Sequence, residues 1–569
     1  MKKTAFLCAL AAAALVSGCA ATRQAAQKQS ARQTVKKELN PMALFRFVDG
    51  VTYDLKENYA AALISYQEAL LYDSTSAEIY MAIAREYLRL GKIESARPFV
   101  QNALKLDGDN LEASEMLASI YMDTEQWASA EQILSEVLER DPENVSAYYS
   151  MAQIYLQRGK GPQAVDMLEK VIAYQPSIDN QVYISLGELY LKLGNFDKAE
   201  QIFSQVISRD ETESFGYYGV GLAKEAKQDT PGAVTYYKRA LELNSEMDFA
   251  RERLSAIYAE SGQWDSAIGL YKEQTENDTT NVSAMLALSE LYRQKGDIPK
   301  ALHTLQNVQK RFPDDYRAFL DAGRIYLDDN EFDSAFSMFQ HVTELDPENF
   351  LGWLFGGIAL FHKGENSDAV FYLNQALKGD PGSPLGNYYL GALYSQEGSN
   401  AKAEGYLKRA VAARPRWVAA LNALASTYDG TGSYTRSDSL FQVILHIEPD
   451  NAVALNNYAY SLSKRVCCLD KALSMVQRAL EIEPDNGAFL DTAGWIHYLR
   501  DDYVQARQYL EKAWEVRKES AEVAGHLGDT YMRLGMHDKA REMYLEALKL
   551  EPGDTGIQKK LDGVNGGRH

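Results

Sequence analysis

The chain has 569 residues, with 59 Lys and Arg against 79 Asp and Glu, so its formal charge at neutral pH is −20. This acidic balance argues against a non-specific nucleic-acid role, which needs a basic surface to neutralise phosphates, and it disfavours acidic partners. Beyond the N-terminal segment, no apolar stretch approaches the roughly 20 residues that a membrane-spanning helix needs.

The first 18 residues have the three parts of an export signal. Residues 1–3 are basic apart from the initiator, residues 4–16 are small or apolar, and Ser17-Gly18 precedes a cysteine. We therefore expect residues 1–18 to be a lipoprotein signal peptide, too short to remain as a membrane helix. Residues 15–19 resemble a bacterial lipobox, which implies that Cys19 becomes the acylated first residue of the mature protein. The alternative is an ordinary secretory signal with an incidental cysteine.

Residues 19–42 are expected to form the lipidated N-terminus and a flexible tether, because they are rich in Ala, Gln, Lys and Arg without a sustained apolar face. Several acyl chains on one cysteine anchor a protein stably, since each buried methylene contributes about 0.8 kcal/mol. Ala20 follows the cysteine, where an aspartate would favour inner-membrane retention in some Gram-negative groups. The expectation is a bacterial envelope protein, anchored in the outer membrane and facing the periplasm.

From residue 43 onward an alanine returns every 34 or 35 residues, with one serine in its place. The series is Ala62, Ala96, Ala130, Ala164, Ala199, Ala233, Ala267, Ala301, Ala335, Ala369, Ala403, Ser437, Ala472, Ala506 and Ala540. Self-similarity at this period is typical of a solenoid of helical hairpins, in which each unit buries its apolar face against its neighbours. The alanine series therefore predicts fifteen such repeats over residues 43–554.

Other residues keep fixed offsets from that alanine. A small residue such as Gly187 stands twelve positions before it, and in most units a tyrosine such as Tyr190 stands nine before it. The small residue permits close helix approach, and the tyrosine fills a groove with its hydroxyl exposed. A glycine such as Gly194 often stands five before the alanine, as expected for the left-handed position past a helix end. A frequent proline twelve after it, such as Pro176, ends the second helix.

This pattern resembles the tetratricopeptide repeat (TPR), a helix–turn–helix unit of 34 residues. The resemblance implies an all-α fold: a right-handed superhelical solenoid of about fifteen repeats. This chain departs from the pattern at Ser437, which stands in the alanine position, and at Lys224, Leu360 and His497, which stand in the tyrosine position. Residues 555–569 are expected to form a short capping helix and a disordered tail.

No motif of catalysis, nucleotide binding or metal binding stands out. The histidines show no ligand spacing with one another, and residues 43–554 leave no room for a catalytic domain of usual size. We therefore expect no enzyme activity, no cofactor and no metal site. The adjacent Cys467 and Cys468 lie in the turn of the thirteenth repeat. Neighbouring cysteines rarely meet disulfide geometry, and a redox role for them stays open.

The resemblance also implies that first helices line the concave, partner-binding face. Apolar side chains at the outward positions of repeats six, ten, eleven and fourteen suggest a contact surface there. These candidate partner-binding residues are Phe215, Tyr218, Leu222, Leu351, Leu354, Ile358, Phe361, Leu385, Tyr388, Trp495 and Tyr498. Repeats ten and eleven are the predicted main patch. The alternatives are that neighbouring repeats bury these residues, or that the repeat frame is shifted by one position.

The functional prediction is a lipid-anchored periplasmic scaffold or adaptor that binds partner proteins through the concave face, in envelope assembly or as a protease adaptor. The last repeats are similar to bacterial outer-membrane TPR lipoproteins. A glycan- or small-molecule-binding envelope module, using Trp495 and Tyr498, is the alternative. An enzymatic role for the cysteine pair is the third hypothesis.

Overall fold

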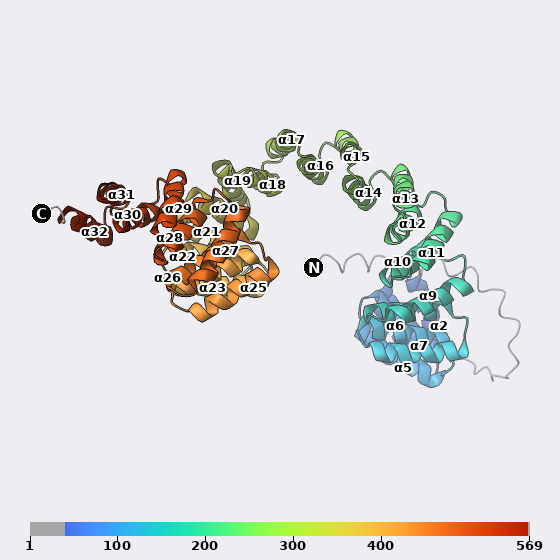
Figure 1. The fold of residues 1–569 in the computed structure, drawn as a ribbon. Helices are drawn as coiled ribbons and strands as arrows, with labels where there is room; N and C mark the ends of the chain where they lie inside the picture. Colours follow the sequence, from blue (N-terminus) through green and yellow to red (C-terminus); the bar gives the residue numbers. More distant parts are fainter. Residues whose placement is uncertain (1–39, 567–569) are drawn as a thin grey trace. The chain divides into compact units, whose positions relative to one another are not determined.

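A computed structural model describes residues 40–566, and every regular element in this range is an α-helix (Figure 1). The all-α prediction is therefore confirmed. None of these helices combines the length and apolar character that crossing a membrane requires. The predicted signal peptide, Cys19 and nearly all of the tether lie outside the described residues.

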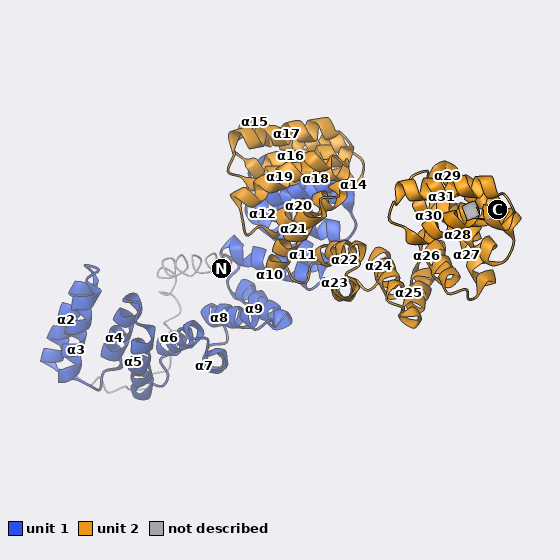
Figure 2. Ribbon diagram, turned by 90° about the vertical axis from the view of Figure 1, so that its left-hand side faces the viewer, with its two compact units in different colours: residues 1–257 blue, residues 258–569 orange. Residues whose placement is uncertain are grey.

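The chain divides into two compact units, residues 1–257 and 258–569 (Figure 2). The helices of the first unit are α2 (Pro41–Asp54), α3 (Tyr59–Tyr72), α4 (Ala77–Arg89), α5 (Ile93–Leu106), α6 (Leu111–Asp123), α7 (Trp127–Arg140), α8 (Val145–Gln157), α9 (Gly161–Tyr174), α10 (Asn180–Lys192), α11 (Phe196–Arg209), α12 (Ser214–Ala226) and α13 (Thr230–Leu243). Helix α14 (Asp248–Glu260) contains the boundary between the units.

The helices of the second unit are α15 (Trp264–Asn277), α16 (Val282–Lys295), α17 (Ile298–Arg311), α18 (Tyr316–Asp328), α19 (Phe332–Leu345), α20 (Phe350–Lys363), α21 (Asn366–Gly379), α22 (Pro384–Gln396), α23 (Asn400–Ala413), α24 (Val418–Gly430), α25 (Tyr434–Ile447), α26 (Ala452–Lys464), α27 (Leu469–Ile482), α28 (Gly487–Leu499), α29 (Tyr503–Val516), α30 (Ala521–Arg533), α31 (His537–Leu550) and α32 (Thr555–Gly566). Helices α2 to α31 follow the alanine series in order, with two consecutive helices for each period.

In the repeats that have a glycine at the small position, the recurring spacing brings this residue of the first helix against a large residue of the second. In repeat nine, a Cβ added to Gly323 would lie 2.6 Å from the Phe339 ring. In repeat fifteen, a Cβ added to Gly528 would lie 2.6 Å from the Tyr544 ring. The alanine of the series is buried beside this contact, as Ala335 and Ala540 show. The absence of a side chain on one helix therefore makes room for the ring of the other.

The turn inside each repeat contains a left-handed residue, as predicted from the glycine position. Nine repeats place a glycine with positive φ there, for example Gly194 with φ 75°. Other repeats force a different residue into the same conformation, such as Glu125 or Asn330. Repeat thirteen has one extra residue, and both Val466 and Cys468 have positive φ.

The turn between repeats has its own chemistry. Proline ends the second helix, and the asparagine of the Asp-Pro-Glu-Asn sequence caps the next first helix. Asn144, for example, accepts a hydrogen bond from the backbone N–H of Ala147 at 2.8 Å. Pro98 does not interrupt its helix, because α5 runs unbroken from Ile93 to Leu106.

Candidate binding surface

The predicted partner residues lie on four first helices, but their exposure differs widely. Phe215 of α12 is exposed, while Tyr218 and Leu222 on the same helix are half-buried. On α20, Leu354 and Ile358 are buried in a core cluster with exposed fractions of 3% and 4%. The remaining residues of α20, α22 and α28 are half-buried: Leu351, Phe361, Leu385, Tyr388, Trp495 and Tyr498.

The predicted patch on repeats ten and eleven is therefore largely packed against the protein itself. The expectation that Leu354 and Ile358 face water was wrong, because neighbouring helices cover them. The aromatic rings around them pair with one another. Phe361 lies 5.1 Å from Tyr389, and Tyr388 lies 4.7 Å from Trp417, measured between ring centroids. Replacing Leu354 by a polar residue would thus disturb the core as well as any contact surface.

The aromatic residues of repeat fourteen form a different arrangement. The Trp495 indole stacks on Tyr498 with ring centroids 4.8 Å apart and an angle of 8°. It also stacks on His526 of the next repeat, at 4.1 Å and 17°. The Arg533 guanidinium lies over the Tyr498 ring at 6.0 Å. These half-buried rings join α28 to α30.

Polar side chains continue this surface across three first helices. His526 Nδ1 lies 2.9 Å from the Asp491 carboxylate on α28. The Tyr460 hydroxyl of α26 donates to Glu522 of α30 at 2.8 Å, although 62 residues separate the two. Repeat thirteen therefore reaches repeat fifteen across the side chains of repeat fourteen.

The two titratable partners in this cluster have shifted pKa values. Burial opposes a charge on His526, but the hydrogen bond to Asp491, together with the charges of Asp491, Glu522 and Asp529, outweighs burial and raises the pKa of His526 above its usual value. Burial and the nearby Glu522 charge raise the pKa of Tyr460. Tyr460 is thus a neutral hydrogen-bond donor at physiological pH, and the imidazole and the carboxylate stabilise each other.

Asparagines on α24 and α26 extend the surface further. Asn457 donates to Asn422 of the preceding repeat at 3.3 Å, and Asn456 donates to Asn457 at 3.4 Å. Asn456 is only 6% exposed, and its Oδ1 accepts no hydrogen bond from the described chain. A side-chain amide can donate to and accept from a peptide backbone, so this pair suits the main chain of an extended segment.

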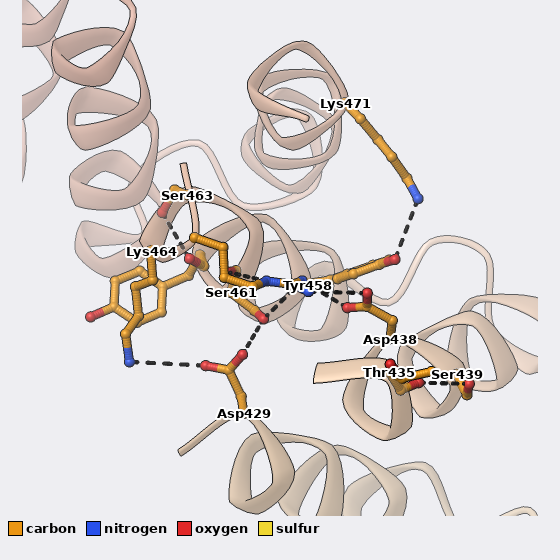
Figure 3. A network of polar contacts seen from close by, with 11 residues as sticks. Asp429, Thr435, Asp438, Ser439, Tyr458, Ser461, Ser463, Lys464 and Lys471 are labelled. Atoms are coloured by element: carbon orange, nitrogen blue, oxygen red, sulfur yellow. Dashed lines mark hydrogen bonds and ion pairs between the residues drawn. The ribbon is translucent and has the colours of Figure 1, made fainter. Parts of the chain in front are cut away.

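A polar network holds α26 against the repeat before it (Figure 3). Asp429, at the end of α24, accepts from the Ser461 hydroxyl and lies 3.9 Å from Lys464. Arg465 pairs with Asp438 of α25 at 2.7 Å. The Lys471 ammonium donates to the Tyr458 hydroxyl at 3.4 Å. These contacts fix the helix that carries Tyr460 and Asn457, although the adjoining turn is one residue longer than in other repeats.

The two cysteines next to this network do not form a disulfide. Cys467 is half-buried and Cys468 is exposed. Burial raises the pKa of the Cys467 thiol, which disfavours the reactive thiolate at neutral pH. The geometry therefore gives no support to a redox centre.

Sequence reasoning found Trp495 and Tyr498 but missed the polar residues beside them. The usable signal was the repeat frame: Glu522 and Asp491 stand at the same offsets from their alanines as the predicted Leu351 and Leu354. The sequence prediction used only the apolar side chains at those offsets. His526 stands one position further along, and its two partners are carboxylates, so the spacing between histidines gives no signal for this group.

Fold and surface together define a helical-hairpin solenoid whose repeats expose aromatic and polar side chains on first helices. Comparison with known families agrees. Matches to the tetratricopeptide repeat family cover residues 87–154, 121–183, 155–214, 258–322, 320–384 and 497–561. These matches take in more than half of the chain, and the protein belongs to the tetratricopeptide repeat family. Such repeats generally mediate binding of protein partners.

Two known proteins are similar to part of the array. A TPR repeat-containing protein of Pseudomonas aeruginosa is 40% identical over 82 residues, which are 14% of this chain and 14% of the relative. A TPR repeat-containing protein of Methanocaldococcus jannaschii is 35% identical over 100 residues, which are 18% of this chain and 17% of the relative. The matched region therefore spans less than a fifth of either relative.

Solved structures with a similar fold have low sequence identity. The Cut9 and Hcn1 hetero-tetramer of APC/C aligns over 86% of this chain and 96% of its own, at 15% identity and a TM-score of 0.42. Yeast Tom70 aligns over 92% and 95%, at 16% identity and a TM-score of 0.32. A tetratricopeptide repeat protein from Parabacteroides merdae aligns over 44% and 98%, at 15% identity and a TM-score of 0.39.

Proposed function

We propose that this protein is a lipid-anchored periplasmic scaffold or adaptor that captures partner proteins on the first helices of its last four repeats. The observation that carries the proposal is a series of side-chain contacts between successive first helices: Asn457 of α26 donates to Asn422 of α24, Tyr460 of α26 donates to Glu522 of α30, and Trp495 of α28, which stacks on Tyr498, also stacks on His526 of α30. Aromatic side chains bordered by hydrogen-bonding groups are the usual anchors of protein interfaces.

The surface favours an extended partner segment over a folded domain. The asparagine amides can pair with a partner's main chain, and the Trp495 and Tyr498 edges can receive an apolar or aromatic side chain. The acidic groups Asp429 and Glu522 at its margins favour a segment without acidic side chains. Support for the anchor comes from residues 1–19, where a basic start, an apolar stretch and a cysteine follow one another as they do in a lipoprotein signal.

A photo-crosslinking amino acid placed in intact cells tests partner capture. We expect position 498 to form protein crosslinks, since its ring lies on the proposed surface. The matched control is position 434, because Tyr434 is also a partly exposed tyrosine (41%) but stands on a second helix. Equal crosslinking at both positions, or none at 498, would contradict a first-helix contact surface.

A second arm separates protein partners from the glycan alternative. Trp495→Ala should abolish co-purification of the crosslinked protein, while Phe371→Ala on the second helix α21 should not. Two rings already stack on the Trp495 indole, which leaves less of its faces for a sugar. Binding of envelope glycan that is lost in Trp495→Ala, with no protein captured, would favour the alternative instead.

A further inference from the structure

Three side chains with metal-binding atoms meet on the first helices of repeats fourteen and fifteen. Asp491 of α28 and Glu522 and His526 of α30 each offer one ligand atom, and these atoms all lie within 4.8 Å of one another. The His526 and Asp491 side chains are 15% and 7% exposed, whereas Glu522 is exposed. The group is thus buried on one side and open to solvent on the other.

The donor set has the chemistry of a divalent transition-metal site. Zn²⁺ is bound by imidazole nitrogen and carboxylate oxygen at about 2.0–2.2 Å, and three protein ligands leave a position for water or a partner's side chain. Ligand atoms around a tetrahedral ion stand roughly 3.4 Å apart at these bond lengths. His526 Nδ1 and Asp491 Oδ1 now lie 2.9 Å apart, so binding an ion would require these two atoms to separate slightly and the exposed Glu522 carboxylate to move closer to both.

The surrounding charge also favours a cation. Within the part of the chain that the structure describes, neither Asp491 nor Glu522 has an ion pair with Lys or Arg. The nearby Asp529 has its own partner, Lys560, at 2.6 Å. Two carboxylates therefore face one imidazole, and no lysine or arginine neutralises them.

Two further residues orient the ligands. The Tyr460 hydroxyl donates to Glu522 Oε1 at 2.8 Å, and the Trp495 indole stacks on the His526 ring at 4.1 Å. Groups that orient a metal ligand affect metal affinity about 10- to 100-fold. Tyr460 and Trp495 are therefore positioning residues, and they connect the group to repeats thirteen and fourteen.

We propose that Asp491, Glu522 and His526 form a Zn²⁺ site that links α28 to α30. An ion there fastens together the helices that carry Trp495, Tyr498 and the Tyr460 contact, so it stiffens the surface proposed to capture partners. The inference stands apart from partner capture, because metal binding is measured on the chain alone. Without a metal, the same residues would form only an Asp–His and a Tyr–Glu hydrogen bond.

The test uses the full-length chain, stripped of metal by a chelator and titrated with ZnCl₂ in a calorimeter. The adjacent Cys467 and Cys468 are replaced (Cys467→Ser, Cys468→Ser) to remove a competing thiol site. We expect one equivalent of Zn²⁺ to bind. Glu522→Gln and His526→Gln should weaken that binding by roughly 100-fold or more, and Tyr460→Phe by about 10- to 100-fold.

The matched control is His497→Gln. His497 also stands on α28 and lies 3.2 Å from a carboxylate, that of Asp502, but it belongs to no group of three metal-binding side chains in the described residues. Its replacement should leave Zn²⁺ affinity unchanged. Circular dichroism verifies that each variant is folded, and Glu522→Gln keeps the test decisive because Glu522 is exposed. Equal Zn²⁺ affinity in the wild type and Glu522→Gln would overturn the proposal, as would no binding by the wild type at micromolar Zn²⁺.

Co²⁺ provides an independent readout of position. A Co²⁺ ion bound by His526 lies beside the stacked Trp495 ring and should quench its fluorescence. Trp495→Phe should then remove the Co²⁺-dependent part of the signal. Quenching that is identical in Trp495→Phe would place the ion elsewhere and overturn the assignment.

Discussion

At the residue scale, the small position of a first helix is explained by the large side chain that it faces. Gly187 stands opposite the Phe203 ring, and Gly357 stands opposite the aliphatic side chain of Leu373. The small residue on one helix leaves space for the large residue on the other. An added methyl at a glycine of this kind must displace that side chain.

Gly323→Ala should destabilise repeat nine. Its Cβ would lie 2.6 Å from the Phe339 ring, and overpacking costs about 1–3 kcal/mol. The better helix propensity of alanine returns only about 0.5–1 kcal/mol, so a net loss is expected. Faster hydrogen exchange in α18 and α19 is the measurement. Gly405→Ala is the control: nothing lies within 4 Å of that Cβ, so α23 should become more protected. Unchanged exchange in Gly323→Ala would contradict the packing argument.

His497 gives a second residue-scale prediction, because it replaces the usual tyrosine. Burial lowers the pKa of His497, and Arg500 adds to this effect, although Asp502 opposes it. In the unfolded chain this histidine has a pKa of about 6.5, so the unfolded state binds the proton at a higher pH than the folded state does. The stability that the neutral imidazole contributes is present above pH 6.5 and is lost as the pH falls through the folded-state pKa.

Restoring the tyrosine should remove this pH dependence. His497→Tyr places a neutral ring against Tyr509, which now stacks on the imidazole at 5.4 Å. We expect the unfolding midpoint of the wild type to fall more than that of His497→Tyr between pH 7.5 and pH 5.5. Other titrating groups are common to both chains and cancel in the comparison. Parallel pH profiles for the two chains would show that His497 is protonated equally in both states.

At the element scale, α32 covers the end of the last repeat. Ile557, Leu561 and Val564 are buried in one cluster with Tyr544 and Ala547 of repeat fifteen. Every interior repeat is covered by the repeat that follows it, and α32 takes that role here. Its sequence is the C-terminal segment in which we predicted a short cap, and the helix extends from Thr555 to Gly566.

Leu561→Ala should loosen this end of the array. Truncating a buried leucine costs about 2–5 kcal/mol, so hydrogen exchange of α31 and α32 should accelerate. Helices several repeats away, such as α23, should be unaffected, because each repeat contacts only its neighbours. Val504→Ala is the control, since Val504 is 53% exposed. Acceleration along the whole second unit would show that α32 supports more than the last repeat.

The helix pairs could be predicted because their determinants are local. The alanine, the small residue and the turn residue all lie within one period, and one register accounts for fifteen units. Burial of the first-helix surface was less predictable, because it depends on the adjacent repeats. Leu354 occupies an outward offset and is nevertheless covered. Asp491 and His526 are in contact although 35 residues separate them in the sequence, and no sequence motif identifies a pair at that separation.

At the scale of the whole molecule, the residues that stabilise the solenoid differ from those proposed to attach it to a membrane. Packing between neighbouring repeats stabilises the array, while the proposed anchor lies before the first described helix. The two roles use different residues, so each can be removed without the other. Under the proposed function, membrane attachment depends on the N-terminal segment.

Cys19→Ala should release the chain from the membrane fraction without unfolding it. Acyl chains on this cysteine would contribute about 0.8 kcal/mol for each buried methylene, and the substitution removes the only sulfur at the predicted cleavage site. Cell fractionation and labelling with an alkyne fatty acid measure the outcome. The control chain, Cys467→Ser with Cys468→Ser, should remain labelled and membrane-bound.

If Cys19→Ala loses the label but stays in the membrane fraction, the array itself binds a membrane component, and the lipid is not needed for attachment. If it becomes soluble and still crosslinks at position 498, anchor and capture surface act independently, as expected when binding needs only the last repeats.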